Sequence, residues 1–167
     1  AIMQPTYFPW LGYFDLIANS KDFIFLDNVK FNKSSYHHQN KILGANGVVL
    51  LSVPTFTNKG RMGTLINEVE IDLNSRYYEK HQKSIILNYN KSLFFSNTSK
   101  AIFEVFEKNI NNLSCLNIEL IKVLNNLLGI IIGNLDLISR KMESGGKLQK
   151  QLEKAQKAAL RGAALTK

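Results

Sequence analysis

The sequence predicts an α/β fold: a mainly parallel sheet opened by a tight βαβ unit, with helices filling the second half of the chain. Strand-like and helix-like patterns alternate over residues 2–27, and a helical period takes over from about residue 74. A chain of 167 residues that is 45% hydrophobic and 20% charged is also long and apolar enough to bury a core of its own.

The βαβ unit rests on three short segments. Ile2 and Met3 are apolar and run into a proline-rich loop, residues 12–18 have a helical pattern, and residues 23–26 are apolar throughout. A short strand without polar alternation is typical of a strand covered on both faces. Two strands joined by a helix pair in parallel, so we expect residues 2–4 and 23–27 to be neighbours.

The middle of the chain predicts further strands. Asn46 and Gly47 form a strong hairpin-turn signal, and the apolar segment 48–53 that follows is stopped by Pro54. Residues 55–64 are polar and predict a mobile loop, whereas residues 67–72 alternate as a half-buried strand does. The alternative is an α+β fold in which segments 48–53 and 67–72 form a separate antiparallel pair.

Three helices are expected in the second half, near residues 75–89, 97–110 and 115–128. Asn74 or Ser75 is a suitable N-cap for the first helix. Gly129 is a natural residue to end the third helix.

The composition changes after residue 134. Residues 1–134 contain every aromatic side chain and every asparagine, whereas residues 135–167 are rich in Ala, Gln and Lys. Residues 145–146 are a Gly-Gly break, and residues 147–165 have a thin apolar stripe. We therefore expect an α/β domain at 1–134 and a basic helical tail at 135–167. The tail is a weakly packed surface helix, a self-association helix or foreign sequence, and we favour the last.

Charge and composition bear on the partners. The tail contributes +5 of the net charge of +8, so the basic residues are not concentrated on the shaped part of the chain and no nucleic-acid partner is expected. The longest uninterrupted apolar run is 127–132, so no membrane insertion is expected either. A single cysteine fits a cytoplasmic location.

The opening loop is the first candidate for a site. Two prolines and a glycine shape it, and it offers an amide, two hydroxyls and a large aromatic face from Gln4, Tyr7, Tyr13 and Trp10. Aromatic faces stack on sugars and bases alike, so we expect these residues to form the wall of a small-molecule site. The alternative is that the rings only pack the loop onto the sheet.

A polar cluster follows the second strand. We expect His38 to act as a base or substrate ligand and Asp27 to orient it, because a base needs a neighbour that fixes its tautomer. Lys33 or Lys41 would face a phosphate, with Asn40 nearby. The adjacent histidines at 37 and 38 point in different directions on a strand or a helix, so no metal site is expected.

These segments resemble the WbqC-like protein family, which is associated with bacterial O-antigen and other surface polysaccharides. The resembling motifs are Met3-Gln4-Pro5 with Phe8-Pro9-Trp10-x-Gly12-Tyr13-Phe14-Asp15-Leu16-Ile17, then Phe25-Leu26-Asp27, Phe31-x-Lys33 to Asn40-Lys41-Ile42, Tyr78-x-Lys80-His81 and Ile85-x-x-Asn88-Tyr89. Tyr36 and Gln39 stand where the family typically has Trp and Arg. The motif resemblance covers roughly residues 1–130. Family members continue into a further α/β portion, so we expect the domain to be C-terminally incomplete.

The resemblance implies a role in surface-glycan biosynthesis. The expected activity is a transferase that modifies a nucleotide-linked amino-sugar, by aminoacyl or acyl transfer to the sugar amine, with His81 among the substrate-binding residues. The alternatives are a non-catalytic sugar- or nucleotide-binding module and a nucleotidyltransferase-like enzyme. No P-loop or G-x-G-x-x-G motif occurs in the sequence, and no cofactor is expected.

Overall fold

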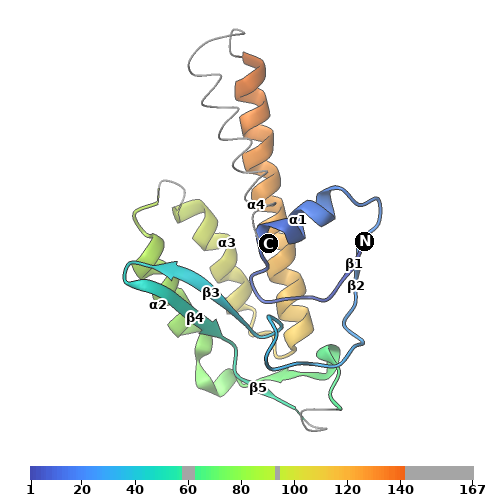
Figure 1. Cartoon of the computed structure of the whole chain (residues 1–167). Coiled ribbons are helices and arrows are strands. Elements are labelled where there is room, and N and C mark those ends of the chain that lie inside the picture. Colours follow the sequence, from blue (N-terminus) through green and yellow to red (C-terminus); the bar gives the residue numbers. More distant parts are fainter. Residues whose placement is uncertain (58–62, 93–94, 142–167) are drawn as a thin grey trace. The chain divides into compact units, whose positions relative to one another are not determined.

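The computed structural model describes residues 1–57, 63–92 and 95–141, and within them the chain is mixed α/β (Figure 1). The elements in chain order are β1 (Ile2–Met3), α1 (Leu11–Ala18), β2 (Ile24–Phe25), β3 (Gln39–Gly44), β4 (Gly47–Ser52), β5 (Thr55–Phe56), the 3-10 turn η1 (Ile66–Glu68), β6 (Glu70–Ile71), the 3-10 turn η2 (Leu73–Ser75), α2 (Tyr77–Tyr89), α3 (Phe95–Glu107) and α4 (Leu113–Lys141).

The opening βαβ unit is confirmed. β1 and β2 are parallel neighbours, with Ile2 opposite Ile24 and Met3 opposite Phe25. The mainly parallel sheet is not confirmed, because the other two ladders of the described residues are antiparallel and each of the three has two strands. The physical reason lies in the connections: a turn of two residues joins β3 to β4, and so short a turn permits only antiparallel pairing.

The β3–β4 hairpin is the longest ladder among the described residues. Gly44 lies opposite Gly47, so the turn residues are Ala45 and Asn46, one position earlier than the sequence predicts. Gly47 has a φ of 116°, which favours glycine at this position. The hairpin lies along α2 (Figure 1), whose Asn88 accepts a hydrogen bond from the backbone of Ala45.

The strand predicted at 67–72 is shorter than expected. Within this segment the strand consists of Glu70 and Ile71, which pair with Phe56 and Thr55 of β5. The alternation itself is correct, since Val69 and Ile71 are buried and Glu70 is exposed. Within the loop expected at 55–64, residues 58–62 lie outside the described part of the chain.

The three predicted helices are present, with two corrected ends. The cap expected at Asn74 or Ser75 is wrong: Asp72 caps the 3-10 turn that contains them, and the left-handed Arg76 precedes α2. Gly129 does not end α4, which continues to Lys141. A glycine inside a helix costs only about 1 kcal/mol relative to alanine, so a helix can continue through it.

The described chain forms two compact units. The smaller contains Ala1, Trp10–Phe23 and α4 from Leu124 on; the larger contains Ile2–Pro9 and Ile24–Val123. The larger unit carries most of the buried side chains. Its buried apolar residues include Tyr7, Val53, Ile66, Val69, Val105, Phe106, Leu113, Leu116, Leu120 and Ile121.

One stretch of the described residues, Leu113–Leu135 in α4, is long and apolar enough to cross a membrane by length and composition alone. Glu119 and Lys122 lie within this stretch, so its uninterrupted apolar runs are short. A core helix passes the same test, and Leu113, Leu116 and Leu120 on this helix are buried in the larger unit. The Gly-Gly break and the tail helix expected at 147–165 lie outside the described residues.

Candidate functional site

The larger unit holds two loop segments together through one buried side chain. The backbone N–H of Tyr7 donates to the carbonyl oxygen of Tyr36 at 2.9 Å. The Nδ2 of Asn117, which is fully buried, donates to the carbonyl oxygens of Pro5 at 3.2 Å and His37 at 2.8 Å. Asn117 therefore clamps the opening loop to the histidine segment.

The start of α4 places Asn117 at this junction. The helix begins at Leu113 because the Oδ1 of Asn112 accepts a hydrogen bond from the backbone N–H of Cys115, as an N-cap does. Ser114 donates from its hydroxyl to Asp27 Oδ2 at 2.7 Å. Residues three apart share a helix face, so Ser114 and Asn117 hold different segments from the same side of α4.

His37 is held in one tautomer. Its Nδ1 accepts a hydrogen bond from the backbone N–H of Asn32, so the proton lies on Nε2, which donates to the Gln4 Oε1 at 3.0 Å. Burial lowers its pKa, and the neighbouring His38 lowers it further. Both ring nitrogens of His37 are thus occupied by contacts within the protein.

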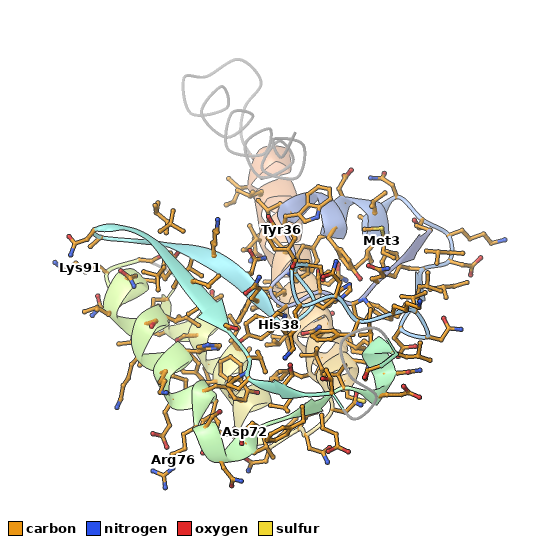
Figure 2. The ribbon with its side chains drawn as sticks, turned by 60° about the horizontal axis from the view of Figure 1, so that its bottom comes forward. Met3, Tyr36, His38, Asp72, Arg76 and Lys91 are labelled. Atoms are coloured by element: carbon orange, nitrogen blue, oxygen red, sulfur yellow. The ribbon has the colours of Figure 1, made fainter. Side chains whose placement is uncertain are left out.

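His38 differs from its neighbour. The side chain is 9% exposed, yet its Nδ1 has no hydrogen-bond partner. Burial lowers the pKa of His38, and the positive charge of Lys33 lowers it further, so the ring is neutral at pH 7. Figure 2 shows His38 inside the layer of side chains, whereas Arg76 and Lys91 lie at its rim. A neutral imidazole accepts a proton at the ring nitrogen that carries none.

Three buried side-chain atoms of the described residues lack a hydrogen-bond partner: Thr6 Oγ1, His38 Nδ1 and Asn117 Oδ1. Buried polar atoms are usually paired. Thr6 follows Pro5 and His38 follows His37, the two residues whose carbonyl oxygens bond to Asn117. We call Thr6, His38 and Asn117 the unpaired set.

Tyr7 and His81, both predicted to bind substrate, contact each other. The Tyr7 hydroxyl lies 2.7 Å from His81 Nδ1, and both side chains are buried. Burial raises the pKa of Tyr7 well above its usual value, and the Tyr77 hydroxyl raises it further. Burial lowers the pKa of His81 to about 4, while hydrogen bonding to the Ser52 backbone acts in the opposite direction. Tyr7 therefore remains a phenol and His81 a neutral imidazole.

Asn40 supports the opening loop rather than pointing away from it. Its Nδ2 donates to the carbonyl oxygens of Tyr7 at 3.2 Å and Phe8 at 2.6 Å. Phe8 has a φ of 47°, a left-handed conformation that is strained for a residue with a bulky side chain. Its ring packs edge-on against Tyr7 at 4.7 Å. Asn40 and this aromatic contact hold the strained residue in place.

The remaining predicted residues occupy varied surroundings. Lys33 and Lys41 are exposed, and Gln4 is an exposed side chain bonded to His37. Asp27 is half-buried and accepts from Ser114; it does not bond Nδ1 of His38, which has no partner. Its role in orienting His38 stays a prediction.

Trp10 and Tyr13 belong to the smaller unit. Tyr13 is buried and packs beside Phe23, with ring centroids 5.5 Å apart. Trp10 is 43% exposed, and its ring covers Gly12 so closely that a Cβ there would lie 1.5 Å from a ring carbon. Only glycine fits under the ring in this arrangement.

Sequence reasoning missed Thr6, Ser114 and Asn117 as members of the site. One signal was available: Asn117 stands between Leu116 and Ile118 on an apolar helix, and a buried amide must bond to something beyond that helix. Which segments it bonds is not encoded in local sequence.

The residues that the structure describes include no group of three or more His, Cys, Asp or Glu side chains arranged to hold a metal ion.

Comparison with known proteins gives two matches. A model of the WbqC-like protein family matches residues 4–161, a range that includes most of residues 135–167. An uncharacterized protein of Mycobacterium tuberculosis, Rv1507c, is 33% identical over 131 residues. The match covers 78% of this chain and 56% of Rv1507c, so the chain spans only a little more than half of that relative. No solved structure matches.

Proposed function

The chain belongs to the WbqC-like protein family, and we propose that it is a transferase of surface-glycan biosynthesis that acylates the amine of a nucleotide-linked amino-sugar. The observation that carries the proposal is His38: a buried, neutral imidazole with a vacant Nδ1 beside the charge of Lys33. The glycan context comes from the family motifs in the first 42 residues and in α2.

Acyl transfer to an amine requires a base. The amine nitrogen attacks the carbonyl carbon of an acyl thioester, an amide bond forms and the carbon–sulfur bond breaks. With the ring proton of His38 on Nε2, the amine proton passes to Nδ1, and the departing thiolate takes that proton away. His38 suits this step because its lowered pKa keeps it unprotonated at neutral pH. Lys33 is exposed and close enough to act on the ring electrostatically, so it would face the phosphates.

The first experiment is a thermal-shift screen with nucleotide sugars, free nucleotides and acyl-CoA donors. A ligand at about a hundred times its Kd should stabilise the protein by about 2.7 kcal/mol. A shift with an amino-sugar nucleotide supports the proposal. A shift with duplex DNA and none with any sugar nucleotide would contradict it.

The second experiment measures transfer directly. Incubation with UDP-glucosamine and acetyl-CoA, followed by mass spectrometry, should show an acetylated amine. His38→Gln should lower the rate by about a hundredfold or more, the usual contribution of a general base. His37→Gln is the matched control, because both nitrogens of His37 already have partners, and it should change the rate by less than about tenfold. Binding of the sugar nucleotide without transfer from aminoacyl or acyl donors would indicate a non-catalytic binding module instead.

A further inference from the structure

The two faces of the β3–β4 hairpin differ in their exposure to solvent. One face includes Leu51, which is buried. Side chains alternate between the faces of a strand, so Leu50 and Val48 lie on the other face, where Val48 is opposite Leu43. Leu43, Val48 and Leu50 are 72%, 67% and 54% exposed. Apolar side chains that are exposed side by side mark an interaction surface, whereas single ones are ordinary.

Polar and charged side chains surround these three aliphatic ones. Lys41 is exposed and lies opposite Leu50 on the same face of the hairpin. The Tyr89 hydroxyl accepts a hydrogen bond from the backbone N–H of Leu43 at 3.2 Å, so the end of α2 lies beside β3. Figure 2 shows Lys91, which is also exposed, next to the turn of the hairpin. We call the following residues the hairpin surface: Lys41, Leu43, Val48, Leu50, Tyr89 and Lys91.

The charge around the hairpin surface has one sign. Residues 28–57 and 80–92, which include the whole hairpin and most of α2, contain six lysines and no Asp or Glu. A second copy of this surface would bring lysines against lysines, which disfavours self-association. A nucleic acid would attract the lysines through its phosphates, but its backbone offers exposed leucine and valine side chains no apolar surface to cover them.

An anionic lipid surface matches both properties of the hairpin surface. Aliphatic side chains enter the boundary between headgroups and acyl chains, and lysines are attracted to the negative headgroups beside it. A tyrosine suits the same depth, because its ring is apolar and its hydroxyl is polar.

We propose that the hairpin surface binds an anionic membrane surface and lies on it without crossing it. Leu43 and Val48, the pair nearest the turn, enter the headgroup boundary, while Lys41 and Lys91 contact lipid phosphates. The proposal goes beyond the acyl transfer proposed above and involves neither His38 nor a sugar nucleotide.

The first test measures sedimentation of the wild-type protein with lipid vesicles. One set of vesicles contains equal parts of phosphatidylcholine and phosphatidylglycerol, and the other contains phosphatidylcholine alone. The protein should bind the anionic vesicles at least about tenfold more tightly, because each lysine near the surface adds to the attraction. Added sodium chloride should weaken this binding. Binding to neither set of vesicles, or equal binding to both, would overturn the proposal.

The second test changes the hairpin surface itself. The double variant Leu43→Thr/Val48→Thr keeps residues that favour strands and should bind anionic vesicles about tenfold more weakly. Lys41→Gln should weaken the same binding about fivefold. Because these positions are exposed, both variants should keep the melting temperature of the wild type.

The chain offers a matched control for each variant. Ile2 and Ile24 lie opposite each other in the β1–β2 ladder and are 59% and 54% exposed, so Ile2→Thr/Ile24→Thr removes a similar apolar pair elsewhere in the larger unit. Lys21→Gln removes one charge at an exposed position beside Asp22. Both controls should leave vesicle binding unchanged.

Two further outcomes would count against the lipid surface. Losses in the controls as large as those in the hairpin variants would show that overall charge and apolarity, and not this surface, determine binding. Dimers that Leu43→Thr/Val48→Thr abolishes, in a protein that does not bind anionic vesicles, would assign the surface to a second copy and overturn the proposal.

Discussion

Two buried polar groups of the larger unit differ in how completely they are paired. Tyr7 and His81 bond to each other, and aromatic side chains surround them, with Tyr77 and Phe106 within 6.4 Å of the His81 ring centre. In the unpaired set, Thr6, His38 and Asn117 each keep one polar atom without a partner. Both groups lie in one unit and include one histidine each.

The difference separates structural polar residues from candidate functional ones. A closed pair, in which two buried groups bond to each other as Tyr7 and His81 do, adds to the stability of the fold and leaves those bonding atoms occupied. An open set, in which buried polar atoms stay unpaired, lowers stability and keeps these atoms able to form a hydrogen bond. Identity alone does not separate the two, because each group contains an imidazole. The substrate-binding roles of Tyr7, His81 and His38 stay predictions, and the pairing of their polar atoms is what distinguishes these residues.

The largest effect is expected for Asn117→Ala, which tests whether the unpaired set depends on its clamp. The substitution leaves the carbonyl oxygens of Pro5 and His37 without their donor and opens a cavity at a fully buried position. It should lower the free energy of unfolding by about 3 to 5 kcal/mol, as measured by urea denaturation. Asn126→Ala, at an exposed position of the same helix, should change it by less than about 0.5 kcal/mol. Equal effects of the two substitutions would show that Asn117 is not a clamp.

A smaller decrease in the free energy of unfolding is expected on acidification, and it tests the pair formed by Tyr7 and His81. Burial lowers the pKa of His81 from 6.5 to about 4 in the folded protein. Between those values the unfolded chain binds the proton and the folded chain does not, so stability is complete above pH 6.5 and falls as the pH drops toward 4. The loss attributable to His81 should approach about 3 kcal/mol at pH 4.

Other groups titrate in the same range, so the contribution of His81 needs a reference. Urea denaturation of the wild type and of His81→Gln at several pH values isolates it. The wild type should lose more free energy of unfolding between pH 7 and pH 4 than the variant does. Parallel pH dependence of the two proteins would show that His81 is accessible to protons in the folded state.

The sequence predicted local features well because local rules determine them. The parallel contact of residues 2–3 with 24–25 and the helices over most of 75–128 follow from periodicity and chain reversals. The extent of the sheet was overestimated, because the sequence does not say how many short strands join one ladder. The length of α4 past Gly129 was underestimated, because glycine permits a helix end without requiring one.

The site was predicted less completely. His38 was identified from its residue type, but its difference from His37 depends on Gln4 and on the backbone of Asn32, which occupy the His37 ring. The pairing of Tyr7 with His81 joins residues 74 positions apart. Such contacts depend on tertiary packing, so residue type and spacing do not predict which histidine has hydrogen-bond partners for its ring nitrogens and which does not.

The smallest decrease in the free energy of unfolding is expected for Tyr7→Phe. This substitution removes the hydrogen bond to His81 and keeps the aromatic ring. The variant keeps the ring that packs on Phe8 and loses the hydroxyl that bonds His81 Nδ1. A buried nitrogen left without its partner should lower the free energy of unfolding at pH 7 by about 1 to 3 kcal/mol. Tyr36→Phe, at a tyrosine that is 59% exposed, should change it by less than about 0.5 kcal/mol. If Tyr7→Phe is as mild as Tyr36→Phe, the hydrogen bond between Tyr7 and His81 does not stabilise the fold.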